Sequence, residues 1–145
     1  MKKIALVVFA LMFVSVIGAA QTAKRRAVRT GPPNGIYSPA IVTGELVFTS
    51  GQIGFDSKTG QLVEGFEAQF EQAFRNLAAV LEASGSDVDH ILKATVFLAD
   101  MNDYGVLNEL YKKKFKGDPP ARTTVQVARL PRDARLEIEA VAVLK

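Results

Sequence analysis

Two charged side chains stand in apolar segments near the end of the chain. Arg122 lies in PPARTTVQVARLP and Glu137 in RLEIEAVAV, and both segments read as strands. A guanidinium can hold a carboxylate through two parallel hydrogen bonds, and a glutamate can take a proton from water. Each also has an ordinary explanation, because a strand-end arginine is usually a surface ion pair and a strand glutamate can discourage edge pairing.

Composition excludes several kinds of chemistry. The 145 residues include no cysteine and a single histidine, His90. Disulfides, thiolate metal sites and cysteine nucleophiles are therefore excluded, and a multi-histidine zinc site cannot form. Asp87 and Asp89 precede His90, but such close neighbours do not orient an imidazole by themselves. We expect a partly exposed histidine at the start of a strand.

The first residues predict export. Lys2 and Lys3 precede an apolar run at 4–17, and the small residues at 18–20 suit signal peptidase. The run is short for a membrane-spanning helix, which needs about 20 residues; an uncleaved anchor is the alternative. We expect a signal peptide at 1–20, a periplasmic or secreted protein that begins at Gln21, and no stable membrane association after cleavage.

Charge gives little reason to expect nucleic acid as a partner. Without Lys2 and Lys3 the formal net charge falls from +3 to +1. Part of the remaining excess lies in the polar stretch at 21–33, which we interpret as a flexible basic arm. The lysines at 112–116 are typical of the solvated C-terminal end of a helix. A nearly neutral domain predicts no nucleic-acid partner.

The hydrophobic pattern predicts the element order β-β-α-β-α-β-β. Strands are expected at 41–43 and 46–53, a helix at 66–83, a strand at 90–99, a helix at 103–115 and two strands within 122–144. The helices follow from apolar residues that recur every three or four positions. Two helices cover one face of one sheet, which predicts a two-layer α+β domain whose other face stays open.

Alternation of side chains along a strand assigns the faces. In the last strand Leu136 and the alternate residues up to Leu144 are expected to meet the helices, while Glu137 points away. In the strand before it Val125 is expected in the core and Arg122 on the open face. The open face would then combine polar groups with apolar side chains, and we interpret it as a subunit interface that contains a polar pocket.

From residue 34 onward the chain resembles the reactive intermediate deaminase family, the RidA/YjgF group. The resemblance rests on FTSGQIG (48–54), KATVFLADMNDY (93–104), PPARTTVQVARLP (119–131) and RLEIEAVAV (135–143), in the family's order and spacing. It implies that 34–145 form a RidA-like domain of chorismate-mutase-like fold, an α+β two-layer domain with a six-stranded mixed sheet and two helices on one face. It also implies a homotrimer with pockets between subunits.

The family's activity implies a hydrolytic deaminase that converts reactive enamines and imines, typically 2-imino acids, to 2-oxo acids and ammonia. No metal or organic cofactor is implied, and the expected small-molecule partner is an imine or a 2-oxo acid. By position Arg122 would grip the substrate carboxylate, because lysine cannot reproduce its two-pronged pairing. Glu137 would hold the attacking water and exchange protons with it.

The further substrate-binding residues implied by the resemblance are Tyr37, Ser50, Gly51, Asn102 and Thr124. Asn102 can instead cap the second helix, and Ser50 with Gly51 can mark close backbone packing. Thr124 stands where many family members carry cysteine, so a thiol-dependent role is excluded. The Gly-Pro-Tyr motif familiar in the family reads GIY at 35–37.

Two other interpretations compete with the hydrolase. One is a non-catalytic ligand-binding or holdase-like trimer of the same fold. The other is a nuclease or translation inhibitor, against which export and low net charge count. Arg122 together with Glu137 favours the hydrolase, because packing alone needs neither residue.

The last two strands are expected to pair directly, turning at 130–133, which sets Gln126 opposite Glu137; the alternative is that the two strands are separated in the sheet. Arg122 then lies about four residues from Glu137 along the strands, roughly 13 Å. A small imino acid cannot span that gap. We therefore expect the Arg122 and Glu137 of one site to come from neighbouring subunits.

Overall fold

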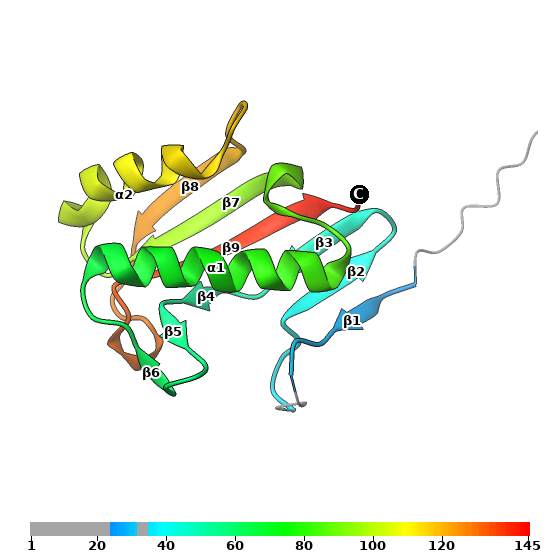
Figure 1. Cartoon of the computed structure of the whole chain (residues 1–145), viewed down its shortest axis with the longest axis horizontal. Helices are drawn as coiled ribbons and strands as arrows, with labels where there is room; N and C mark the ends of the chain where they lie inside the picture. The colour runs from blue at the N-terminus through cyan, green and yellow to red at the C-terminus, as the bar shows by residue number, and fades with distance from the viewer. Residues whose placement is uncertain (1–23, 32–34) are drawn as a thin grey trace, which may run out of the picture.

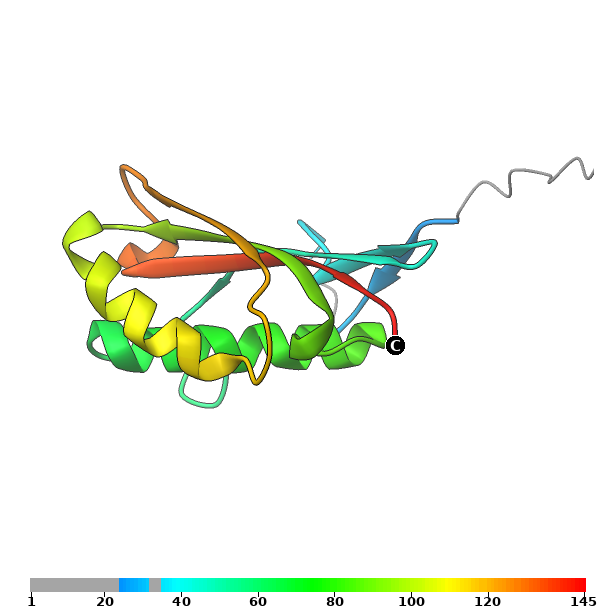
Figure 2. The ribbon, with the colours of Figure 1, turned by 90° about the horizontal axis from the view of Figure 1, so that it is seen from above.

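The structure, a computed structural model, describes residues 24–31 and 35–145. The expected signal peptide at 1–20 lies outside these residues, as does the first part of the expected arm. No helix within the described ranges is long and apolar enough to cross a membrane. The chain forms a mixed β-sheet with two helices packed on the same face, as Figures 1 and 2 show.

The main sheet has seven strands in the described part of the chain, where six were expected. The strands are β1 (Arg26–Val28), β2 (Ala40–Thr43), β3 (Leu46–Thr49), β4 (Gln52–Ile53), β7 (Ile91–Leu98), β8 (Ala121–Gln126) and β9 (Leu136–Val143). Their order is β1-β2-β3-β9-β7-β8, with β4 paired to β9 off this path. Among the described strand pairs of this sheet, β7 and β8 run parallel and the others run antiparallel. A small second sheet pairs β5 (Phe55–Asp56) with β6 (Gln61–Leu62).

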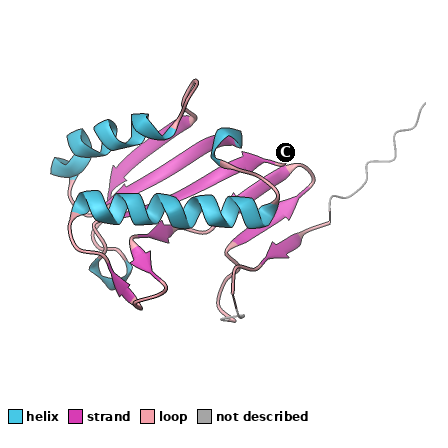
Figure 3. Cartoon of the chain, viewed as in Figure 1, coloured by secondary structure: helices cyan, strands magenta, loops and turns pink. Residues whose placement is uncertain are grey.

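The helices confirm the predicted periodicity. Figure 3 shows the long helix α1 (Phe66–Ser84) crossing the sheet and the shorter α2 (Tyr104–Tyr111) near its β8 edge. α1 ends at Gly85, whose φ of 92° is a left-handed conformation that glycine adopts without strain. The short 3-10 turns are η1 (Val88–His90), η2 (Met101–Asp103), η3 (Lys112–Lys114) and η4 (Pro131–Asp133).

The core lies between α1 and the central strands. β9 alternates as predicted. Its buried side chains are Leu136, Ile138, Ala140 and Ala142, and its partly covered ones are Glu137, Glu139, Val141 and Val143. Phe70 and Leu77 of α1 belong to the same buried cluster as Leu136 and Ile138. Burial of each such large side chain contributes about 1.5–3 kcal/mol, which fixes the face that β9 turns to the helices.

The predicted hairpin of the last two strands is wrong. β9 lies between β3 and β7, and β8 lies on the far side of β7. The reason is that α2 carries the chain back along the sheet, so that β8 repeats the direction of β7 in a strand-helix-strand unit. η4 then turns the chain around the end of β7 before β9 begins. Glu137 therefore lies opposite Phe97 of β7, and not opposite Gln126.

The predicted face of Arg122 is also wrong. The parallel register sets Arg122 beside Ala94 and Thr124 beside Val96, and both β7 residues are buried on the helix side. Arg122 and Thr124 therefore face α2, while Val125 is 38% exposed on the open face. The prediction assumed that apolar residues always meet the helices. At the edge strand β8 the covering helix presents polar groups, so that assumption fails.

The prediction of a flexible arm at 21–33 is also wrong for the middle of that stretch. Arg26–Val28 form β1 and pair with β2 at the edge of the sheet. Val28 is only 3% exposed, and Arg26 Nη2 donates a hydrogen bond to the Ser84 carbonyl at the end of α1 (3.1 Å). One buried valine and one arginine bound to α1 therefore hold this charged segment against the domain.

Candidate active site

Glu137 lies on the open face of β9, beside the short strand β4. Its backbone pairs with Ile53, and Gly51 immediately precedes β4. A Cβ on Gly51 would overlap the Glu137 carboxylate. Only glycine leaves room for the carboxylate at this position, so one side of the carboxylate rests on bare backbone.

The chain leaves the sheet briefly to make this contact, so the strand predicted at 46–53 is split. At the end of β3 the Thr49 hydroxyl accepts a hydrogen bond from the Ala140 N–H (2.9 Å) in place of a strand carbonyl. Ser50 donates twice to the preceding segment, from its N–H to the Pro39 carbonyl (2.8 Å) and from its hydroxyl to the Ser38 carbonyl (2.7 Å). Ser50 therefore ties the Gly51 position to the segment that follows Tyr37.

The environment of Glu137 favours its protonated form. Burial, and to a lesser extent the charge of Glu139, raise the pKa of the Glu137 carboxyl above its ordinary value. Glu139 is two residues further along β9 and faces the same side. A carboxylate with a raised pKa is a stronger base, and therefore a better acceptor for a proton from water.

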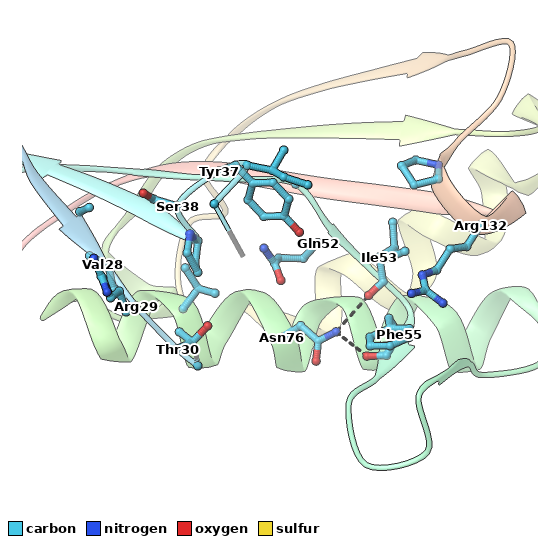
Figure 4. A pocket seen from close by; sticks show the side chains of 18 of the residues that line it. Val28, Arg29, Thr30, Tyr37, Ser38, Gln52, Ile53, Phe55, Asn76 and Arg132 are labelled. Atoms are coloured by element: carbon cyan, nitrogen blue, oxygen red, sulfur yellow. Dashed lines mark hydrogen bonds between the residues drawn. The ribbon is translucent and has the colours of Figure 1, made fainter. Parts of the chain in front are cut away.

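A pocket of about 690 Å³ adjoins Gly51. Tyr37 and Gln52 line its middle, and α1 contributes Asn76 and Val80 to one wall. The Asn76 Nδ2 group donates to the carbonyls of Ile53 (3.0 Å) and Phe55 (2.9 Å), drawn as dashed lines in Figure 4. These two bonds fix β4 and β5 to α1 and so give the pocket a rigid wall.

Arg122 lies near the other edge of the sheet, against α2. Its Nη2 donates to Asn108 Oδ1 (2.5 Å), and its Cζ lies 4.7 Å from the ring centroid of Tyr111 and 5.6 Å from that of Tyr104. These α2 residues are spaced four and three apart, so they share one helix face. The two rings and the amide hold the guanidinium in one orientation.

The surroundings of Arg122 contain two further polar groups. The hydroxyls of Tyr111 and Thr124 are buried and form no hydrogen bond with any described residue. Burial raises the pKa of Tyr111 to about 12, against the opposing effect of the Arg122 charge. The Tyr111 hydroxyl therefore stays neutral at physiological pH.

The structure groups the predicted site residues in two places. Tyr37 and Gly51 line one pocket, Ser50 is bonded beside it, and Glu137 rests on Gly51. Arg122 and Thr124 lie apart from them on β8.

Asn102 belongs to neither group in its expected role. It lies in η2, where its N–H donates to the Asp100 carboxylate (2.8 Å), so Asp100 caps this turn and the cap considered for Asn102 is not found. Asn108 was not predicted, although it contacts Arg122 directly. The spacing of Tyr104, Asn108 and Tyr111 on one helix face was the signal that could have found it.

Arg122 and Glu137 of one chain are far apart. Glu137 pairs with Phe97, and Phe97 pairs with Val125, which lies three residues beyond Arg122 on β8. Two strand spacings across and three residues along give about 10 Å in each direction. The two side chains also lie on opposite faces of the sheet. The two side chains of one chain are therefore far apart, as predicted. The predicted hairpin, from which that distance was argued, is wrong.

His90 takes no part in either group. Its Nδ1 lies 2.6 Å from Asp87 Oδ1 at the start of β7, and its side chain is 39% exposed, which confirms a partly exposed histidine. Glu137 lies near the other end of β7, opposite Phe97. Within the described residues, no group of three or more histidine, aspartate or glutamate side chains is placed to hold a metal ion.

Three comparisons with known proteins bear on these residues. Residues 28–144 match the family model described as Endoribonuclease L-PSP. The 2-iminobutanoate/2-iminopropanoate deaminase of Rattus norvegicus is 49% identical over 110 residues, which cover 75% of this chain and 80% of that protein.

Solved structures agree over the same region. RidA from the Antarctic bacterium Psychrobacter sp. PAMC 21119 is 40% identical with a TM-score of 0.78, over 82% of this chain and 99% of that one. TdcF from E. coli with bound serine is 39% identical with a TM-score of 0.77, over 83% of this chain and 99% of that one. The α+β architecture with a mixed sheet and two helices is therefore that of these proteins.

Proposed function

This chain belongs to the Endoribonuclease L-PSP family, the RidA/YjgF group, and from that membership we propose that it is a hydrolytic deaminase of reactive imines and enamines. It converts 2-imino acids to 2-oxo acids and ammonia. The observation that carries the proposal is the Glu137 carboxylate, raised in pKa and seated on Gly51 beside a pocket, in a chain 49% identical to an imine deaminase.

Glu137 supplies the proton chemistry. Water adds to the imine carbon while Glu137 takes one of its protons, which gives a carbon bearing both a hydroxyl and an amine. Glu137 passes that proton to the nitrogen to complete the amine, and then takes the hydroxyl proton and gives it to the amine as the C–N bond breaks, so that the oxygen becomes the carbonyl of the 2-oxo acid and ammonia leaves. One water is consumed for each imine, and an enamine enters the same sequence after a proton adds to its carbon.

Arg122 holds the substrate carboxylate. Asn108 and the two tyrosine rings hold its guanidinium, and the remaining N–H groups of the fork stay available for a carboxylate. Thr124 lies beside Arg122 and supplies a hydroxyl for the polar end of the substrate. The serine bound to TdcF carries the carboxylate and the nitrogen that such a site must accept.

The site is completed between subunits of a homotrimer. Apolar side chains on the open face support this, since Leu46 is 36% and Phe48 42% exposed there, beside Val143 and Val141. The distance between Arg122 and Glu137 within one chain supports it as well. In the assembled protein Arg122 and Thr124 of one subunit would meet Glu137, Gly51 and Tyr37 of the next.

Two further proposals concern Asn102 and the first residues of the chain. Asn102, the middle residue of η2, would contact substrate, as the resemblance implies. The protein is exported, on the strength of the predicted signal peptide at 1–20, which lies outside the described residues. N-terminal sequencing of the native protein tests this, and Gln21 should be its first residue.

Hydrolysis of a freshly generated imine tests the function. A neutral 2-imino acid is produced from its amino acid by an oxidase, in the presence and absence of the purified protein. The protein should speed the appearance of the 2-oxo acid and ammonia, and Glu137→Gln should remove most of the acceleration. Binding of the 2-oxo acid without any acceleration would leave a non-catalytic ligand-binding trimer as the function.

A further inference from the structure

One end of the pocket is formed by a second arginine that the reaction above does not use. We name this end the Arg132 arm and define it by Gly51, Ile53, Phe55, Pro131 and Arg132. Arg132 belongs to η4, and its Cζ lies 4.5 Å from the ring centroid of Phe55. Figure 4 shows Arg132 at one end of the pocket and Arg29 at the other, with Tyr37 and Gln52 between them.

The Arg132 arm lies on the same side of the chain as the Glu137 carboxylate. A Cβ on Gly54 would lie 2.6 Å from the Gln69 backbone, so the Gly54 position faces α1. Ile53 pairs with Glu137 in the sheet, so the two side chains share the face that is turned away from α1. The chain bends at Gly54, and Phe55 beyond the bend lines the same pocket with the Arg132 guanidinium over its ring. Ile53 and Phe55 are two residues apart, so their Cα atoms lie at most about 7 Å apart, which is the length of a small acid.

The Arg132 guanidinium has no acidic partner in the described part of the chain. Its neighbour Asp133 is held by Arg129, through bonds of 2.6 and 3.0 Å. Arg25 and Arg29 also line the pocket, and none of its described lining residues is an aspartate or glutamate. The pocket therefore has positive charge at each end and no aspartate or glutamate among its described lining residues, which favours an anion within it.

The backbone holds Arg132 in place at a conformational cost. Arg132 and Asp133 have φ of 60° and 59°, the left-handed region that a bulky residue seldom adopts. The ion pair of Arg129 with Asp133 stabilises this turn. Glycine or asparagine would adopt this left-handed conformation with less strain than arginine. The presence of arginine here therefore indicates that its guanidinium has a function.

We propose that Arg132 binds a second carboxylate of the substrate, so that the enzyme prefers 2-imino acids with an acidic side chain. The proposal rests on the proposed function: the neighbouring subunit's Arg122 holds the carboxylate next to the imine, Glu137 of this chain delivers water to the imine carbon, and Arg132 of this chain holds the far carboxylate. A pocket of about 690 Å³ lies in the size range of small-molecule sites and has room for this longer substrate.

Competition between an acidic and a neutral imine tests the proposal. Imines are generated in place from aspartate or glutamate and from 2-aminobutyrate, and kcat/KM is measured for each with the purified protein. Arg132→Asn keeps a residue that tolerates the left-handed turn but removes the charge. It should lower the acidic-to-neutral ratio of kcat/KM at least tenfold, and Arg132→Lys should lower it less. Arg75→Gln, an exposed arginine of α1 that does not line the pocket, should leave the ratio unchanged.

A binding measurement separates this proposal from the proposed function. By calorimetry a 2-oxo dicarboxylic acid should bind the wild-type protein more tightly than a neutral 2-oxo acid of similar size, and Arg132→Asn should abolish the difference. Wild-type protein that hydrolyses neutral imines without an acidic preference overturns the proposal and leaves the function standing. Equal losses on both substrates in Arg132→Asn mean a structural role and also overturn it. Acidic preference in binding without hydrolysis of any imine overturns the function, while the carboxylate site at Arg132 stands.

Discussion

The carboxylate of Glu137 fills the space into which a side chain at Gly51 would project. The two residues come from strands far apart in the sequence, β9 and the turn before β4, and their contact sets where the carboxylate points. The proposed role of Glu137 as the base depends on this contact. Substitution of Gly51 is therefore the first test of that role.

Gly51→Ala should remove most of the activity with little loss of fold. The added methyl group forces the carboxylate to move, and an error of about 1 Å in position can cost about 100-fold in rate. Measurement of kcat/KM together with the thermal unfolding midpoint checks this. Gly117→Ala is the matched control, because a Cβ there meets nothing within 4 Å. Unchanged activity in Gly51→Ala would show that the carboxylate position is not important.

Glu137→Gln should raise stability at neutral pH while it lowers activity about 100-fold or more. The folded state raises the pKa of Glu137, so ionisation favours the unfolded chain as soon as pH exceeds the unfolded pKa. The stability advantage of Glu137→Gln should therefore be absent below about pH 4, grow as pH rises from the unfolded pKa to the raised one, and stay constant above it. Urea unfolding at several pH values measures it. An advantage that is the same at low and neutral pH would contradict the raised pKa.

Asp87→Asn should destabilise the domain at neutral pH and have no effect in strong acid. The hydrogen bond from His90, with help from Lys145, lowers the pKa of Asp87 to about 2. The stability that this carboxylate supplies is present above its unfolded pKa and is lost as pH falls through the folded value. The melting temperature should drop by a few degrees at pH 7, and the difference should shrink as pH falls below 4 and disappear below pH 2. Asp89→Asn, the exposed neighbour, should change little across the same range.

Arg122→Lys should weaken substrate binding while the fold is kept. Lysine retains the positive charge. It lacks the planar guanidinium that pairs with a carboxylate through two hydrogen bonds, and it cannot make the same hydrogen bond to Asn108. A rise in KM with a 10- to 100-fold loss of kcat/KM, on the order of 1.5–3 kcal/mol, is expected. Tyr111→Phe is the control within the same cluster, since its hydroxyl is bonded to no described residue. Full activity of Arg122→Lys would place the carboxylate elsewhere.

Mixed trimers should recover activity from two inactive proteins. Arg122→Ala cannot bind the substrate carboxylate and Glu137→Ala lacks the base. In the proposed homotrimer, mixed subunits form interfaces where an intact Arg122 meets an intact Glu137. Subunits are exchanged under mild denaturation, and mass measurement verifies the mixture. Exchange without any recovery of activity would show that the two residues do not act across an interface.

The sequence predicted best the elements whose burial is regular. α1 and β9 each bury one uninterrupted set of side chains, at helical and at alternate spacing, and both were found where expected. Val28 shows the opposite case. It is one buried residue among arginines, and a short edge strand with one inward side chain leaves no periodicity to detect.

The position of Arg122 could not be read from alternation alone. Its face depends on which residues of β7 lie beside it, and pairing across a crossover is not encoded within β8 itself. Asn108 was missed for a related reason. A single polar residue in a helix has no distinctive pattern until the partner across the layer is known.

β9 comes last among the strands that the structure describes, yet it lies in the middle of the main sheet. It is flanked by β3 and β4 on one side and by β7 on the other. One of its backbone bonds reaches Thr49, 91 residues earlier. Contacts between such distant residues slow folding, and here none of them can form before the ribosome has made the segment that contains β9. A nascent or truncated polypeptide that stops before Leu136 exposes the open edges of β3 and β7, the kind of surface that holds chaperones and leads to aggregation.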